Sequence, residues 1–339
     1  MKIRRHFNDY NFIADQETGI TFRWGKTLNE NPYFAPIPEL ADISISNHCS
    51  KGCSFCYRNS KPDNSFMSTE DYELIMKNLK HSQSGSVFQV ALGGGEPLEH
   101  PNIVDILDIT RSYDVVPNFT TNGIFLTKKI ADNIKGKVGA VAVSLTNFDD
   151  YSESNIELLI NSEIRTNIHF VVDNQNIKDA IKILIGNYNH LLQNINAIVF
   201  LTYKPAGRGE TSLVLQDNAD FQTFLSLIDN NKCICRIGFD ACFVPMLMRY
   251  TKTRIEYIDA CEVGFFSVYI DEKLNVSPCS FSNGADSYNL REYDFYDIWL
   301  NKFKDFRSRH NNMCKQDCIA KKSCRGFCPY YPQITTCYK

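Results

Sequence analysis

The chain has 339 residues, a formal net charge of −3 and 43% hydrophobic residues. This near-neutral charge does not indicate a basic surface for nucleic acid. The sequence contains no run of about 18 uncharged apolar residues, so no membrane span is predicted. The first ten residues lack the apolar core of a signal peptide, so we expect a cytoplasmic protein with no nucleic-acid or membrane partner. In that compartment, thirteen cysteines indicate metal or redox centres rather than disulfides.

The first 39 residues contain two runs of alternating apolar residues around the turn-rich segment 15–19. This pattern predicts a β-hairpin, which we expect to cover an edge of the domain that follows. An independent module that binds a leader peptide would need about twice this length to build its own core.

Cys49, Cys53 and Cys56 follow a strand-like run that begins at Ile43, in a C-x3-C-x2-C spacing. The spacing places three thiolates on one tight loop. A closed zinc or iron–sulfur site normally has four protein ligands, so a set of three leaves one metal position open. The alternatives are a three-ligand zinc site and three buried structural cysteines.

Strand and helix patterns alternate after this loop. Ser68 and Asp71 form a capping pair that opens a helix ending near Lys80. We then expect strands at 87–92, 115–121, 138–144, 164–172 and 195–201, and helices at 100–113, from 127, at 155–161, 177–191 and 218–230. With the first strand these make six strand–helix units. Such units predict a parallel sheet with ligand residues at the carboxyl ends of its strands.

Polar and small residues stand at several of these strand ends. The second strand ends in glycines followed by Glu96; the glycines permit close approach of the backbone to a ligand, and Glu96 supplies an acceptor. Further candidate ligand residues are Thr121, Asn122, Ser144, Asn167, His169 and Arg208. Ser144 can equally be a strand-end cap, and His169 a hydrogen-bonded interior residue.

The last part of the chain is rich in cysteine. The ordered set is Cys261, Cys279, Cys314, Cys318, Cys324, Cys328 and Cys337. Residues 261–264 and 277–279 predict a hairpin with a thiol at each end. Seven thiols are too many for one site, and both iron–sulfur sites and a zinc knuckle use such short spacings.

The cysteine loop, with Phe55 just before its third cysteine, and the glycine–glutamate turn about forty residues later resemble the radical S-adenosylmethionine (radical SAM) superfamily. The resemblance implies an α/β fold, a partial (β/α)6 TIM-like barrel. Cys49, Cys53 and Cys56 would then hold a 4Fe-4S cluster whose remaining iron binds SAM. The implied SAM contacts are Phe55 near the adenine, Gly94, Gly95 and Glu96 on the amino group, Ser144 on the ribose, Asn167 or His169 near the ribose or carboxylate, and Thr121, Asn122 and Arg208 lining the pocket.

The cysteine-rich tail resembles the SPASM extension of radical SAM enzymes, which carries two auxiliary 4Fe-4S clusters. The resemblance implies a first auxiliary cluster on Cys261, Cys279 and Cys328, with Cys242 as its candidate fourth ligand. The second would use Cys314, Cys318, Cys324 and Cys337. The spacing of Cys314 and Cys318 is one residue longer than the family's usual C-x2-C.

Cys233, Cys235 and Cys242 stand outside these motifs. Cys233 and Cys235 alternate with Ile234 and are typical of small buried residues on one face of a strand. One of the three cysteines could instead donate a hydrogen atom to a substrate radical, and if Cys242 is not a ligand, the substrate could bind the cluster. The candidate catalytic residues are therefore Cys242, Cys235 and Asp240.

We expect four regions: an N-terminal hairpin at 1–39, the radical SAM barrel at 40–232, a connecting segment at 233–260 and the SPASM domain at 261–339. The resemblance implies three 4Fe-4S clusters, SAM and an electron donor such as flavodoxin or ferredoxin. It favours a maturase that cross-links, epimerises or forms a thioether in a ribosomal precursor peptide. The alternatives are a catalyst acting on a small molecule, a sulfatase maturase, for which Ser280 replaces an expected acidic residue, and a metal-binding scaffold that never cleaves SAM.

Overall fold

The fold is described from a computed structural model, which describes residues 2–81, 85–311, 314, 324–335 and 337. Its centre is a ten-stranded sheet in the order β12-β11-β10-β9-β8-β7-β4-β13-β14-β15. Neighbouring strands from β12 to β13 are parallel, and β14 and β15 continue the sheet antiparallel.

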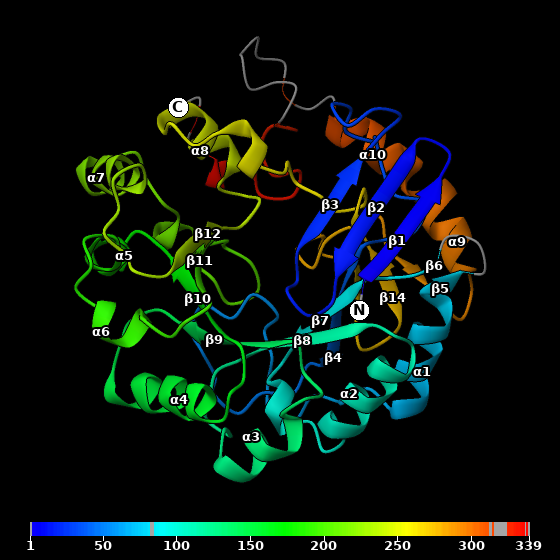
Figure 1. Cartoon of the computed structure of the whole chain (residues 1–339), viewed down its shortest axis with the longest axis horizontal. Helices are drawn as coiled ribbons and strands as arrows, with labels where there is room; N and C mark the ends of the chain where they lie inside the picture. Colours follow the sequence, from blue (N-terminus) through cyan, green and yellow to red (C-terminus); the bar gives the residue numbers. More distant parts are fainter. Residues whose placement is uncertain (1, 82–84, 312–313, 315–323, 336, 338–339) are drawn as a thin grey trace.

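The parallel strands alternate with helices that lie around the outside of the curved sheet (Figure 1). The strands are β4 (Leu40–Ser46), β7 (Gln89–Gly94), β8 (Val116–Thr121), β9 (Ala140–Leu145), β10 (Thr166–Val172), β11 (Ala197–Thr202), β12 (Arg236–Phe239) and β13 (Ser267–Ile270). The helices are α1 (Thr69–Asn78), α2 (Ile103–Ser112), α3 (Lys128–Ile134), α4 (Asp150–Asn161), α5 (Ile177–Leu184), α6 (Asn189–Leu192), α7 (Ala219–Ile228) and α8 (Val244–Tyr250). The six predicted strand–helix units are confirmed.

The sheet is wider than predicted. β12 lies in the segment expected to be a connection and pairs with β11, while β13, from the cysteine-rich region, pairs with β4. The predicted hairpin after Cys261 is confirmed as β13 and β14 (Asn275–Ser277). The expected (β/α)6 sheet is therefore extended at both edges by later parts of the chain.

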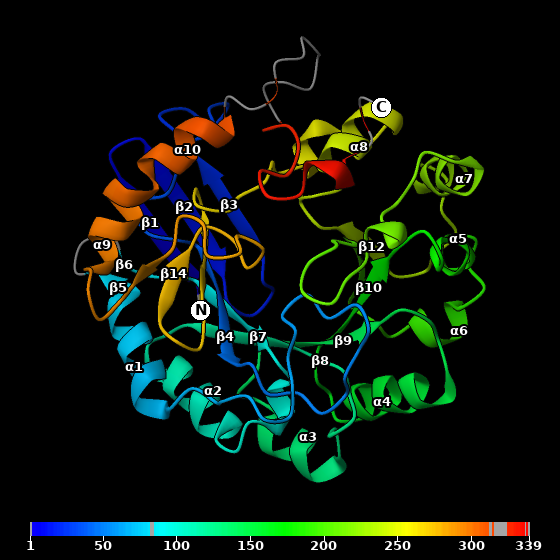
Figure 2. The same cartoon turned by 180° about the vertical axis from the view of Figure 1, so that it is seen from behind.

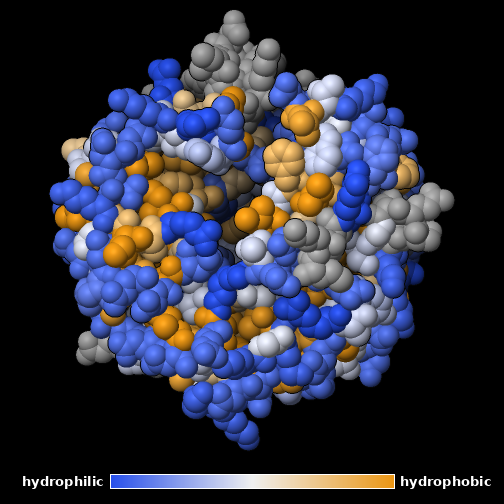
Figure 3. Space-filling model, in the orientation of Figure 1, coloured by the Kyte–Doolittle hydropathy of each residue, from blue (hydrophilic) through white to orange (hydrophobic). Residues whose placement is uncertain are grey.

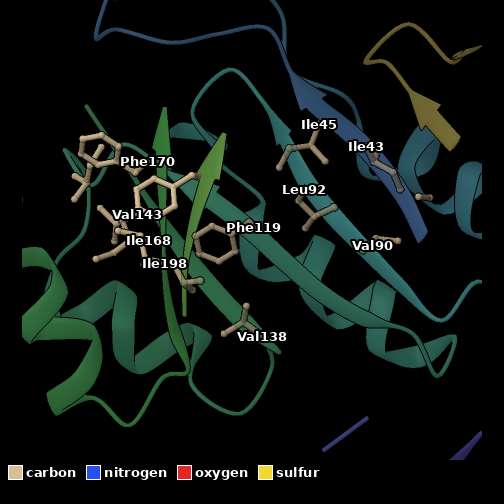
Figure 4. Close-up of a cluster of buried hydrophobic side chains, with 14 of the residues drawn as sticks. Ile43, Ile45, Val90, Leu92, Phe119, Val138, Val143, Ile168, Phe170 and Ile198 are labelled. Atoms are coloured by element: carbon tan, nitrogen blue, oxygen red, sulfur yellow. The ribbon is translucent and has the colours of Figure 1, made fainter. Parts of the chain in front are cut away.

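The main core lies between the sheet and its helices. Figure 4 shows how it is built, with Ile43 and Ile45 from β4, Val90 and Leu92 from β7, and Phe119 from β8. Each is at most 2% exposed, and burying such a side chain contributes about 1.5–3 kcal/mol. Because successive side chains of a strand point to opposite faces, the alternate residues of β4 face the inside of the barrel.

Local signals explain where two helices differ from the predicted limits. The helix predicted at 177–191 is interrupted between α5 and α6, where Gly186 has a φ of +90°. The helix predicted at 155–161 begins earlier, because Asp149 and Ser152 form a reciprocal capping box at its start. A glycine with a positive φ and a capping box therefore set the limits of these two helices.

The remaining elements are short. They are β5 (Lys80–His81), β6 (Gly85–Ser86), η1 (Pro97–Glu99), η2 (Thr211–Leu213), η3 (Ile255–Tyr257), β15 (Tyr288–Asn289), α9 (Phe295–Asp297), the π-helix η4 (Ile298–Lys302), α10 (Phe303–Asn311) and η6 (Pro332–Ile334). Among the described residues, no helix combines the length and apolarity needed to cross a membrane.

The N-terminal region is a three-stranded antiparallel sheet rather than a hairpin. The predicted turn joins β2 (Tyr10–Asp15) to β3 (Thr21–Trp24), and β1 (Lys2–Phe7) adds a third strand beside β2. The sheet lies on the amino ends of the barrel strands: Phe12 packs against Phe88 before β7, and Arg165 before β10 donates to the Glu17 carbonyl. The expected edge position was therefore wrong.

Arg23 of β3 holds this sheet to two distant segments. Its guanidinium is 2.9 Å from the carboxylate of Glu39 and 2.8 Å from that of Glu262, and it stacks 3.7 Å from the ring centroid of Phe266. Burial raises the pKa of Glu39 to about 7 despite this partner. The N-terminal sheet and the cysteine-rich region thus share one partly buried ion-pair network.

We expect Arg23→Ala to lower the free energy of unfolding by about 1–3 kcal/mol, because it leaves the partly buried carboxylates of Glu39 and Glu262 without their cation. Chemical denaturation followed by tryptophan fluorescence measures the change. Lys26→Ala is the control, since the exposed Lys26 lies 3.8 Å from Asp9 and should contribute less than about 1 kcal/mol. Equal effects of the two substitutions would contradict the importance of the network.

Candidate functional site

The predicted cysteine loop follows β4 and is seen in front of the strands in Figure 2. Cys49, Cys53 and Cys56 are free and partly exposed. The Cys49 amide donates to the Lys61 carbonyl at 3.2 Å, and the Cys56 amide donates to the Cys53 carbonyl at 3.3 Å. The backbone of the loop is therefore fixed while its three thiols remain accessible.

Gly94 and Gly95 seat this loop against the end of β7. The Gly95 amide donates to the Ser46 carbonyl at 2.8 Å, and the Glu96 amide donates to the His48 carbonyl at 2.9 Å. A Cβ atom at position 94 would clash with Ser44 and Ser46, and one at 95 with the His48 backbone. We expected these glycines to let the backbone approach a ligand closely. In the structure they let it approach the end of β4 and the segment that leads into the cysteine loop.

We expect Gly95→Ala to displace the loop and to reduce the iron that the protein retains after anaerobic reconstitution by about four atoms per chain. Gly93→Ala is the matched control, because a Cβ atom at Gly93 meets no atom within 4 Å. The iron content of both variants, measured on monomeric protein, checks the prediction. Full iron retention by Gly95→Ala would contradict it.

Glu96 links the ends of three elements from a buried position. Its carboxylate accepts hydrogen bonds from the Thr121 hydroxyl at 2.6 Å, the Asn122 amide at 2.7 Å and the Leu98 amide at 3.0 Å. Burial raises the pKa of Glu96, and these three bonds act against that increase. A carboxylate accepts about four hydrogen bonds, so Glu96 keeps room for one further donor.

A cavity of about 110 Å³ lies beside the cysteine loop. It brings together four of the predicted site residues, Cys53, Phe55, Asn122 and Ser144. The side-chain amide of Asn122 also lies 3.9 Å from the sulfur of Cys49. A polar pocket thus adjoins the three thiols at the carboxyl ends of β8 and β9.

Three predicted ligand residues have other contacts. His169 pairs in register with Ser144 and lies 3.1 Å from the Thr120 hydroxyl, and burial lowers its pKa to about 4, so it is neutral near pH 7. Asn167 accepts a hydrogen bond from Asn196 at 2.7 Å. Arg208 donates to the carbonyls of Cys53 and Ser60, both at 2.8 Å, so it binds the backbone of the cysteine loop.

The barrel interior contains a carboxylic acid that the sequence analysis missed. Asp42 of β4 accepts a hydrogen bond from Ser280, the residue after Cys279. Burial raises the pKa of Asp42 to about 6, although the nearby Arg58 favours the charged form. Arg58 itself lies 2.5 Å from Glu272. The alternation of Asp42, Ser44 and Ser46 with isoleucines was the available signal for a polar inner face.

Four more of the predicted thiols surround a second cavity of about 180 Å³. They are Cys242, Cys261, Cys279 and Cys328. Lys204 and Asp240 form a buried ion pair of 2.8 Å on the same wall, and Lys204 lies 4.7 Å from the ring centroid of Phe281. Burial acts to lower the pKa of Lys204, but Asp240 and, after it, the neighbouring Cys242 raise it, so Lys204 stays charged beside the cysteines.

The thiols surround a space instead of meeting at one point. Within the part of the chain that the structure describes, no three His, Cys, Asp or Glu side chains are grouped to hold a single metal ion. Four thiols around a cavity can bind a metal centre larger than one ion, such as an iron–sulfur cluster.

The second predicted set of tail cysteines is only partly described. Cys314 and Cys324 both lie against Gly326: a Cβ atom on Gly326 would meet Cys314, and the Gly326 amide donates to the Cys324 sulfur at 3.3 Å. Cys337 is buried. Cys318 lies outside the described residues.

The predicted catalytic residues do not lie together. Cys242 and Asp240 line the larger cavity, where Asp240 is bonded to Lys204 and to the Thr202 hydroxyl. Cys235 precedes β12 and lies at the amino ends of the parallel strands, the end opposite the cysteine loop.

An aromatic contact lies between the two thiol groups. Tyr57, next to Cys56, packs against Phe281, two residues after Cys279, with ring centroids 4.7 Å apart. The cysteine loop and the larger cavity are therefore neighbours across one pair of rings.

Comparison with known proteins identifies the central part of this fold. Residues 43–203 match the profile of the Radical SAM superfamily. These residues form a radical SAM domain. The radical SAM fold implies SAM and a 4Fe-4S cluster. The three accessible thiols beside a small polar cavity fit both groups.

The relatives found by sequence are distant and match different shares of the chain. Mycofactocin maturase MftC of Mycobacterium tuberculosis is 23% identical over 305 residues, which cover 83% of this chain and 75% of MftC. GTP 3′,8-cyclase of Clostridium perfringens is 26% identical over 189 residues, 50% of this chain and 56% of the cyclase.

Solved structures share the fold over most of the chain. Streptococcus suis SuiB bound to S-adenosylmethionine has a TM-score of 0.73 at 15% identity, covering 96% of this chain and 94% of SuiB. The structure of anSMEcpe with bound AdoMet and a peptide has a TM-score of 0.60 at 16% identity, covering 85% and 88%. The radical SAM domain and the added sheet edges thus belong to one known architecture.

Proposed function

We propose that this protein is a radical SAM maturase that modifies a carbon centre of a ribosomal peptide, giving a cross-link, a thioether or an epimerised residue. The observation that carries the proposal is the contact of Tyr57 with Phe281. This contact makes the cysteine loop and the larger cavity, which is lined by four thiols, neighbours. The similarity to MftC over most of the chain, and the fold shared with SuiB bound to its precursor peptide SuiA, support it.

In this proposal, Cys49, Cys53 and Cys56 hold the first 4Fe-4S cluster, and SAM lies in the cavity beside them. Phe55 packs near the adenine, while Asn122 and Ser144 offer polar contacts. When bound, the cluster and SAM supply a 5′-deoxyadenosyl radical, which takes a hydrogen atom from an unactivated carbon. Glu96 fixes the position of Asn122, and Gly94 and Gly95 fix the loop that carries the thiols.

The larger cavity would hold the first auxiliary cluster on Cys242, Cys261, Cys279 and Cys328. Its volume, its four thiols and the buried ammonium of Lys204, which offsets the negative charge of a thiolate-bound cluster, support this assignment. The second auxiliary cluster would use Cys314, Cys318, Cys324 and Cys337. A flavodoxin or ferredoxin in the cytoplasm is the proposed electron donor.

Anaerobic reconstitution with iron and sulfide tests the proposal. We expect about twelve irons per chain and slow formation of 5′-deoxyadenosine with SAM and dithionite. Adding short peptides encoded beside the gene should yield a peptide 2 Da lighter for a cross-link or thioether. An epimer should instead have an unchanged mass in H₂O and carry one deuterium when formed in D₂O. No deoxyadenosine at any potential would refute radical SAM catalysis.

A small-molecule substrate is the second candidate, favoured by the similarity of half the chain to GTP 3′,8-cyclase. GTP in place of peptide provides the test: we expect no consumption of GTP and no rise in deoxyadenosine above the uncoupled rate. Conversion of GTP, with every peptide left unchanged, would favour this candidate over the maturase.

We further propose that Asp42, on the inner face of the barrel, accepts a proton from the peptide, and the raised pKa of Asp42 gives a pH-dependent prediction. A carboxyl group whose pKa is higher in the folded state than in the unfolded state stabilises the fold below about pH 4, and this contribution is lost as the pH rises through about 6. Asp42→Asn should therefore raise the free energy of unfolding at pH 7.5 by about 1–3 kcal/mol while lowering peptide turnover at least about tenfold.

Thermal midpoints between pH 5 and 8 measure the stability change, and uncoupled deoxyadenosine formation confirms that the SAM site is intact. The advantage of the variant should be smallest at pH 5. A loss of stability at pH 7.5 would show that Asp42 serves to hold Ser280 in place rather than to accept a proton.

A further inference from the structure

Cys233 and Cys235 form a close pair of thiols far from the cysteine loop of Cys49, Cys53 and Cys56. Their sulfur atoms are 3.5 Å apart, just before β12 and at the amino ends of the parallel strands. The chain bends at residues 234 and 235, which brings the two side chains onto one side. Both thiols are half-buried, and Ile234 between them is 62% exposed.

The neighbouring turn between α5 and α6 fixes the backbone of this pair. The side-chain amide of Asn189 donates to the Lys232 carbonyl at 2.9 Å and accepts from the Ile234 amide at 3.0 Å. The Lys232 amide donates to the Leu184 carbonyl at 2.6 Å. Gly186 has a φ of +90°, and a Cβ atom there would crowd the Asn189 amide, so this glycine is what permits the arrangement.

The two thiols are chemically unequal. The hydrogen bond between the two thiols lowers the pKa of Cys233 to about 7 and raises the pKa of Cys235. Among the described residues, no other ionisable side chain contributes to the shift at Cys233. The flanking charged residues, Lys232 and Arg236, are exposed, and Arg236 donates to the Asn196 carbonyl at 3.1 Å.

We propose that Cys233 and Cys235 are a redox-active dithiol that exchanges with low-molecular-weight disulfides, separately from the SAM site. The Cys233 thiolate attacks one sulfur of the external disulfide and releases one thiolate. Cys235 then loses its proton and attacks the Cys233 sulfur, releasing the second thiolate. The external disulfide gains two electrons, and the protein gains one S–S bond.

The geometry requires only a small movement. A disulfide bond is about 2.05 Å long, so the sulfur atoms must approach by roughly 1.5 Å, which side-chain rotation at a half-buried position can supply. Cys233 has the features of the attacking thiol, a lowered pKa and a neighbouring resolving thiol.

Tryptic digestion gives a direct measurement, because cleavage after Lys232 and Arg236 releases the tetrapeptide Cys233–Arg236. The reconstituted enzyme is equilibrated anaerobically in buffers of reduced and oxidised glutathione, acid-quenched, alkylated and digested. We expect the tetrapeptide to lose two hydrogens while iron per chain is unchanged. A tetrapeptide that stays reduced in every buffer, up to those that release iron, would overturn the proposal.

Alkylation rates separate a reactive pair from two ordinary thiols. Cys235→Ala removes the hydrogen-bond donor, so Cys233 should react with iodoacetamide roughly fivefold more slowly at pH 7. Cys235→Ser keeps a donor and should stay within about twofold of the native rate. Equal rates in all three proteins would show that Cys233 is an ordinary thiol and would also overturn the proposal.

Discussion

Replacing Cys53 with alanine should lower 5′-deoxyadenosine formation by more than about a thousandfold. Cys53 carries one of three thiols on the loop after β4 and also lines the adjoining cavity. Two remaining thiols cannot hold a cluster whose open position must still bind SAM. The loss is expected even without a peptide, since uncoupled cleavage depends only on this site.

Cys233→Ala is the matched control, because it also removes one half-buried thiol but at the other end of the barrel. It should keep about twelve irons and the native rate of SAM cleavage, whereas Cys53→Ala should lose about four irons. Rates that fall equally in both variants would indicate general damage. Undiminished cleavage by Cys53→Ala would exclude the loop as the SAM site.

The repeating units of the barrel were predictable because each strand and helix carries its own periodic pattern. Ile43 and Ile45, or Val90 and Leu92, alternate on a strand whatever the rest of the chain does. The places of β12 and β13 in the sheet were not predicted, because these short strands join it only through pairing with β11 and β4, which lie far away in sequence. Non-local pairing leaves little trace in a single segment.

The candidate site was predictable where a motif and a strand end coincide. Cys53, Phe55, Asn122 and Ser144 do line one cavity. The role of Arg208 was not predictable, because an arginine that holds two backbone carbonyls has no sequence signature different from one that binds a ligand. Asp42 was missed for a related reason: its partner Ser280 lies more than two hundred residues away.

The N-terminal sheet occupies the end of the barrel opposite the cysteine loop, and this arrangement affects access. Figure 3 shows a hollow near the centre of that face, with hydrophobic residues on its rim. The carboxyl ends of the strands carry the cysteine loop and its cavity instead. In the proposed maturase, the peptide would reach the site from the latter end, where the cysteine-rich region supplies Cys279 and Phe281.

Cys242→Ala should abolish peptide modification while leaving uncoupled SAM cleavage within about threefold of the native rate. Cys242 belongs to the group of four thiols around the larger cavity, and its removal leaves three thiols there. We expect about four fewer irons per chain. The cysteine loop keeps its own thiols and contacts. SAM cleavage should therefore persist when peptide modification is lost.

Cys235→Ala is the control, since it removes a thiol seven residues away that does not line this cavity. It should keep all of its iron and its peptide activity. If Cys242→Ala instead keeps about twelve irons and full activity, the first auxiliary cluster has only three protein ligands, and its open iron is available to the substrate. Zinc in place of iron would exclude an auxiliary cluster in this cavity and favour a structural metal site.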